Sequence, residues 1–119
     1  MAAPNIVNTV SIAGQTAVQI VTTTATAIVS NPTSSANVYK LNSLIVSNVD
    51  GANTANITAD LYRSSTAYRI VYKVTVSPLA TLVVVGKDAP MYLMEGDSIR
   101  LTAGANNTLE AISSYEVIG

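Results

Sequence analysis

Alternation of apolar and polar side chains constrains the fold of this chain more than any other feature of its sequence. The segment Ala55–Tyr62 alternates strictly, and the segments Ser98–Ala103 and Leu109–Val117 repeat the pattern, with Ile112 as the residue out of phase. Successive side chains of a β-strand point to opposite faces of its sheet, so each segment presents one apolar and one polar face. The pattern is typical of an antiparallel sheet that covers a core with one side.

Turn residues divide the chain into about eight segments of this kind. We predict turns at Ala13–Gln15, Asp50–Asn53 and Glu95–Asp97, because glycine accepts positive φ and Asp bonds to its own backbone. Short strands at regular spacing are typical of sandwiches and barrels. The predicted fold is therefore all-β, a single antiparallel β-sandwich of jelly-roll type with about eight strands and an extended N-terminal arm.

Two segments are apolar in both phases of the alternation. Val38–Val49 carries Leu and Ile or Val on both parities, and Leu79–Val85 is interrupted only by Thr81. Runs of this kind are typical of strands that are buried on both faces. We therefore expect both segments to be covered on both sides.

The composition agrees with a small β domain. The 119 residues are the length of one domain, and they contain no Phe and no Trp. The apolar mass is Val, Ile, Leu and Ala, of which the β-branched types suit a pleated surface. Among the six Tyr, Tyr68 and Tyr72 share the apolar parity of their segment, which places them in the core or at an interface.

The first third of the chain differs from the rest in its charge. All six basic and seven acidic residues lie between Lys40 and Glu116. We divide the chain into residues 1–37, a charge-free arm with the first strands, and residues 38–119, the sandwich body, within one domain overall. One interpretation of residues 1–37 is ordinary strands of the sandwich with a solvent-exposed face rich in Thr. The other is that Ala2–Ile12 forms an arm that docks on a neighbouring subunit. The candidate interface residues are Ile6, Val7, Val10, Ile12, Val18 and Ile20.

The sequence contains no motif for catalysis or metal binding. It has no His and no Cys, so the usual nucleophile–base pairs and thiolate metal sites are excluded. Glu95 and Asp97 flank a turn glycine, and solvated turn charges explain them better than a catalytic acid pair. A calcium site built by Asp50, Asp88 and the Glu95–Asp97 turn is a weaker alternative. We predict no enzyme activity, no catalytic residue, no cofactor and no bound metal.

Charge and hydropathy exclude two further kinds of partner. The net charge is −1 and the six basic residues are scattered singly, which argues against nucleic-acid binding. No apolar run approaches the roughly 20 residues of a membrane span. The N-terminus has no basic region and no long apolar stretch, so we do not expect a signal peptide.

Four stretches carry a resemblance to a known group of proteins. Leu44–Tyr62 holds a strand–NVDG–strand hairpin, Pro78–Asp88 a VVVGKD run, Met91–Leu101 an MEGDSIR turn, and Ala105–Glu116 a closing LEA…SYE strand. Together they resemble small β-sandwich virion proteins of tailed bacteriophages over about two-thirds of the chain. Where that group has two acids before the turn glycine, this chain has Met94 and Glu95, so an ion bound by such a pair is in doubt here.

The resemblance implies a structural role and no catalytic residue. It implies a capsid decoration (cement) subunit that stabilises the head shell through its N-terminal arm and self-association as a homotrimer, bound to the major capsid protein. The alternative is a neck or tail accessory, or a fibre-tip protein that binds other virion proteins or host-surface glycan. In either case the chain is expected in the virion, after assembly in the cytoplasm of the host bacterium.

Overall fold

A computed structural model describes residues 11–119 of the chain. The described residues form nine strands and no helix, and so none of them forms a helix able to cross a membrane. The strands are β1 (Ile12–Ile20), β2 (Thr26–Ser30), β3 (Val38–Asn48), β4 (Ala55–Arg63), β5 (Thr66–Val76), β6 (Thr81–Val85), β7 (Met91–Leu93), β8 (Ser98–Ala103) and β9 (Leu109–Ile118).

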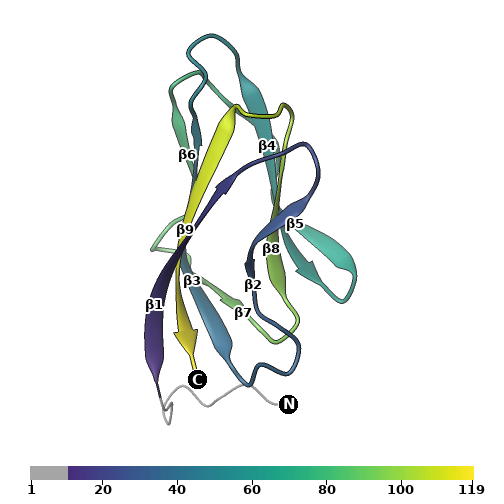
Figure 1. Ribbon diagram of the computed structural model, residues 1–119, viewed down its shortest axis with the longest axis vertical. Helices are drawn as coiled ribbons and strands as arrows, with labels where there is room; N and C mark the ends of the chain where they lie inside the picture. The colour runs from purple at the N-terminus through teal and green to yellow at the C-terminus, as the bar shows by residue number, and fades with distance from the viewer. Residues whose placement is uncertain (1–10) are drawn as a thin grey trace.

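The strands form two antiparallel sheets that pack face to face (Figure 1). One sheet has the order β1-β9-β3-β6, with β7 also paired to β3, and the other has the order β2-β8-β4-β5. The strands β1 to β4 alternate between the two sheets, and β5 pairs with β4 in the same sheet. This interleaved order is that of a jelly roll. The predicted all-β antiparallel sandwich is confirmed. The strand β7 was missed because three residues are too few to show alternation.

Small aliphatic side chains fill the space between the sheets. The side chains that are completely buried belong mainly to β3, β4, β8 and β9 and to the short β7. The largest of them are Leu41, Leu44, Ile57, Leu93, Ile99, Leu101 and Leu109. Each such burial stabilises the fold by roughly 1.5–3 kcal/mol relative to exposure. The alternation in Ser98–Ala103 and Leu109–Val117 thus has its apolar phase in the core.

The expectation that Val38–Val49 is covered on both faces is confirmed only in part, because β3 has no fully exposed residue whereas Val49, beyond its end, is exposed. The register of β3 against β9 shifts between Leu41 and Ser43, because a β-bulge at Asn42 places one extra residue in the strand. The bulge reverses the parity, so Leu41 and Leu44 both point into the core although they are three apart. Leu41, Leu44 and Val46 therefore share the core face, whereas the buried Val38 and the partly buried Ile45 lie on the outer face.

The expectation for Leu79–Val85 is wrong. The strand β6 lies at the edge of its sheet, paired only with β3 among the described strands. Only Val85 of this segment is fully buried, and Val83 and Leu79 are exposed. An apolar run does not distinguish a central strand from an edge strand whose outer face is apolar.

The N-terminal third contributes strands to both sheets. The predicted turn at Ala13–Gln15 is wrong, because Gly14 lies inside β1, opposite Glu116 of β9. The strand β1 joins one sheet and β2 the other, and residues 38–118 supply the remaining strands. Residues 2–10 of the predicted arm Ala2–Ile12 lie outside the described residues. Its last residue, Ile12, is the first residue of β1.

Candidate interaction surface

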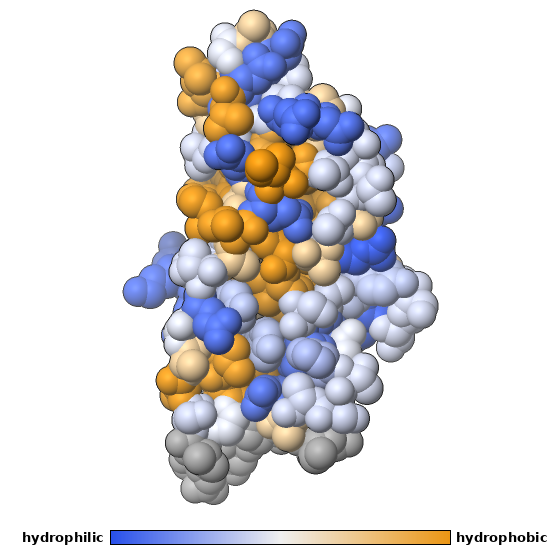
Figure 2. All heavy atoms as spheres, in the orientation of Figure 1, coloured by the Kyte–Doolittle hydropathy of each residue, from blue (hydrophilic) through white to orange (hydrophobic). Residues whose placement is uncertain are grey.

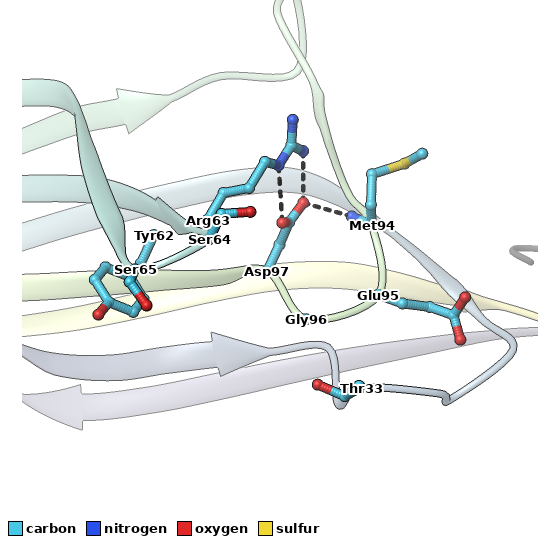
Figure 3. A pocket seen from close by; sticks show the side chains of 9 residues that line it. All are labelled: Thr33, Tyr62, Arg63, Ser64, Ser65, Met94, Glu95, Gly96 and Asp97. Carbon is cyan, nitrogen blue, oxygen red and sulfur yellow. Dashed lines mark hydrogen bonds and ion pairs between the residues drawn. The ribbon is translucent and has the colours of Figure 1, made fainter. Parts of the chain in front are cut away.

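A polar cluster holds three chain connections together at one end of the sandwich. The connections are the β2–β3 loop, the β4–β5 hairpin and the β7–β8 turn, which surround an open hollow of about 590 Å³ (Figure 3). The turn at Glu95–Asp97 is as predicted, with Gly96 at a φ of 86°. Positive φ is the conformation that glycine adopts without steric strain.

Asp97 is the centre of this cluster. Its side chain is only 2% exposed, and its carboxylate accepts hydrogen bonds from Arg63 Nε at 2.8 Å and from Arg63 Nη2. The same carboxylate accepts the backbone N–H of Met94 at 2.7 Å (Figure 3). Two parallel N–H···O bonds form the bidentate pair that is strongest between Arg and a carboxylate. The hydrogen bond to Asp97 raises the pKa of Arg63, which keeps this cation charged.

The neighbouring polar groups of the cluster also have structural partners. Glu95 Oε2 accepts the backbone N–H of Ala36 at 2.8 Å. Asn31, which is buried, donates to the carbonyls of Asn37 and Leu93, both at 3.0 Å. Both acids of the predicted turn therefore hold loops in place. Their hydrogen bonds satisfy buried polar groups, which would otherwise lower the stability of the fold.

The residues of the calcium alternative lie far apart. Asp50 belongs to the β3–β4 loop at the top of Figure 1, whereas the β7–β8 turn lies in the lower half of the molecule. No group of three acidic or metal-ligating residues comes together anywhere in residues 11–119. Asp50 instead accepts the N–H groups of Ala52 and Asn53, which lower its pKa.

The tyrosines of β5 lie on the surface. Tyr68 and Tyr72 are each 56% exposed, so the core half of the prediction is wrong and the interface half stays a prediction. The strand β5 shifts register twice against β4: the first shift moves Tyr72 off the core parity, and the second returns Tyr68 to it, opposite Leu61 near the end of the strand. Arg69 lies 4.9 Å and Lys73 5.2 Å from the centroid of the Tyr72 ring, both within the range of cation–π attraction.

An apolar row crosses the outer face of the β1-β9-β3-β6 sheet. The pairing places Val18 opposite Ile112, Ile112 opposite Ile45, and Ile45 opposite Val83, one residue from each strand. Val18 is 74%, Val83 61% and Ile112 43% exposed, and Ile45 is partly buried. Neighbouring strands lie about 4.8 Å apart, so the row is about 14 Å wide. We call these four residues the apolar row.

Polar residues border the apolar row on both sides. Two residues along the strands in one direction, Thr16 of β1 lies opposite Ser114 of β9. Two residues along in the other direction, Glu110 of β9 lies opposite Ser47 of β3. Ile20 extends the apolar surface along β1 and lines, with Val18 and Ile112, a shallow hollow of about 410 Å³. In Figure 2, hydrophobic residues gather on the half of the molecule that contains β1, β9 and β6. An apolar centre with a polar rim is the usual anatomy of a protein interface.

The structure locates half of the candidate interface residues. Ile12, Val18 and Ile20 are exposed on β1, whereas Ile6, Val7 and Val10 lie outside the described residues. Sequence reasoning did not include Ile45, Val83 and Ile112. The phase break at Ile112 was the signal for that residue, since an apolar side chain on the polar parity has to face outwards.

Comparisons with known proteins add a likeness in fold. No protein-family model and no curated protein matches the chain. Among solved structures, the fold is similar to one described for disulfide-linked pili of Bacillus endospore appendages. The similarity has a TM-score of 0.49 at 15% identity, and it covers 91% of this chain and 85% of that one. This likeness concerns the fold alone, and the virion resemblance remains a prediction.

Proposed function

We propose that this protein is a non-enzymatic structural protein of a bacteriophage virion, a decoration subunit that binds the head shell and associates with further copies of itself. The observation that carries the proposal is the apolar row, of which Val18, Ile112 and Val83 are exposed, with its polar rim. The sequence resemblance supplies the virion context. The polar cluster at the end of the sandwich supports a structural role, since its acids are engaged in holding loops.

The free energy available from covering the apolar row is enough for one weak contact among several. Covering Val18, Ile112, Val83 and Ile20 would contribute on the order of 5 kcal/mol, because each is about half to three-quarters exposed. Association itself costs about 4–15 kcal/mol in lost freedom. The apolar row alone therefore does not hold a lone subunit. Attachment requires a second contact, from the N-terminal segment or from neighbouring copies, which adds avidity.

The test uses phage particles assembled without this protein. The variant Ile112→Glu places a charge in the middle of the apolar row, where docking would bury it without a partner. We expect it to lose attachment in a co-sedimentation assay while it melts like the wild type. The matched control is Thr75→Glu, which puts the same charge on exposed β5 of the other sheet. Full occupancy of the shell by Ile112→Glu would overturn the proposal.

A second candidate is a fibre-tip or neck protein that binds host-surface glycan. The exposed ring of Tyr72, beside the cations Arg69 and Lys73, favours an acidic sugar as the ligand. A glycan array tests it directly. Binding that is lost in Tyr72→Ala and kept in Ile112→Glu would support this candidate over the decoration role.

A further inference from the structure

The edge strands of the two sheets differ in how they are protected from pairing with other chains. The edge β5 carries two register shifts and two cations, Arg69 and Lys73. The edge β2 has five residues and a register shift, and Pro32 follows it closely. The edges β6 and β7 have five and three residues. Short strands, bulges, charges and prolines are the devices by which natural sheets avoid edge-to-edge association.

The edge β1 has none of these devices. Its nine residues include no charge and no proline, and its pairing with β9 runs without a register shift. Figure 1 shows the lower half of β1 at the margin of the molecule. A long, regular and uncharged edge is a template for a further strand.

The hydrogen bonds to β9 determine which backbone groups of β1 face outwards. Ser11 and Gly119 exchange both of their backbone hydrogen bonds, at 2.8 and 2.9 Å, and Val21 donates to Leu109. Hydrogen-bonded residues alternate along an antiparallel pair, so the odd-numbered residues of β1 bond to β9. The N–H and C=O groups of Ile12, Gly14, Thr16, Val18 and Ile20 therefore point to the open edge.

We propose that β1 pairs antiparallel with β1 of a second copy, about a two-fold axis at Thr16. In this register all five outward-facing residues form hydrogen-bonded pairs. Ile12 lies opposite the partner's Ile20, and Gly14 lies opposite the partner's Val18. Thr16 lies opposite the partner's Thr16, a pair that is favourable across strands. Because β1 is uncharged, the contact buries no ion and brings no like charges together.

The two-fold pairing joins the five-stranded sheets of the two copies into one continuous sheet. The outer faces of the two copies then lie on the same side, so their apolar rows form one larger apolar surface. The strand pair is about 30 Å long. Its buried area lies at or below the low end of specific interfaces, about 1,200 Å². We therefore expect a weak dimer, with a dissociation constant in about the micromolar range, in contrast to the trimer that the resemblance implies.

Charge substitutions at Thr16 test the register, with the full chain in sedimentation velocity runs over a range of concentrations. We expect Thr16→Lys and Thr16→Glu each to weaken self-association by about tenfold or more, since equal charges meet at the axis. A mixture of the two variants restores the dimer. Unchanged melting temperatures show that the variants are folded.

A cysteine provides an independent measurement, because the native chain has none. Hydrogen-bonded antiparallel partners have Cα atoms about 5.5 Å apart, within the range of a disulfide. Oxidised Thr16→Cys should form a covalent dimer, and the control Thr75→Cys should form it much more slowly. The proposal fails if both cross-link equally, if the mixed charge variants do not associate, or if the wild type is a monomer, a trimer or an open filament. These outcomes are separate from shell binding and therefore from the virion role.

Discussion

Replacement of Asp97 by Ala tests the polar cluster that holds the loops at one end of the sandwich. The change removes the bidentate pair with Arg63 and leaves the N–H of Met94 without its acceptor. The lost acceptor costs about 1–2 kcal/mol. The lost ion pair costs about 1–2 kcal/mol more, a figure reduced because the Arg63 side chain is 44% exposed and regains water. We expect the free energy of unfolding to fall by about 2–4 kcal/mol.

The assay is thermal unfolding followed by circular dichroism. A domain of this length has an unfolding entropy of about 0.25 kcal/mol/K, so a loss of 3 kcal/mol lowers the melting temperature by about 12 °C. The control is Asp88→Ala, which removes the same charge from an exposed loop and should change stability by less than about 0.5 kcal/mol. If the two variants melt within about 2 °C of each other, the assigned role of the cluster is wrong.

Three further predictions concern the core, a turn and the N-terminal segment. Leu101→Ala should lower the free energy of unfolding by about 2–5 kcal/mol in denaturant titrations, because Leu101 is fully buried. The pKa of Asp50 is lowered, so its stabilisation is complete above the ordinary carboxyl pKa and is lost as pH falls through the lowered value. Asp50→Asn should therefore show a flatter loss of stability below about pH 4. Deletion of residues 1–10 should leave the melting temperature nearly unchanged and abolish shell attachment in co-sedimentation; an unfolded or fully attached product would contradict it.

The sequence predicts most of the sandwich because most strands obey the two-residue period. The segments that became β4 and β8 alternate cleanly, β9 does so except at Ile112, and in all three the apolar phase is the core phase. The turn at Glu95–Asp97 follows from local chemistry, since Gly96 adopts positive φ. These features depend on neighbours in the sequence, and a sequence pattern contains that information.

The errors occur where tertiary structure changes the period or the environment. The bulge in β3 reverses the parity, so Leu41 and Leu44, which are of opposite phase in the sequence, share the core face. The order of strands in the sheet places β6 at an edge. A run of apolar residues in the sequence contains no information about that order. Gly14 indicated a turn, yet a strand tolerates glycine where the side chain would face open space.

The candidate surface was predictable only in part. Val18 and Ile20 were named from their place in a charge-free segment, but nothing in the sequence joins them to Ile45 and Val83. That row exists because β9 lies between β1 and β3, and β3 lies beside β6. Strands distant in the chain become neighbours only through the jelly-roll order.

Attachment to the head shell is the most direct test of the central claim that this chain is a docking subunit. The measurement is the occupancy of purified wild-type protein on particles that lack it, by co-sedimentation, together with the heat resistance of those particles. The decoration role predicts saturable binding and a higher temperature of shell disruption. Protein that remains in solution at all concentrations, with particles no more heat-resistant than before, would contradict it.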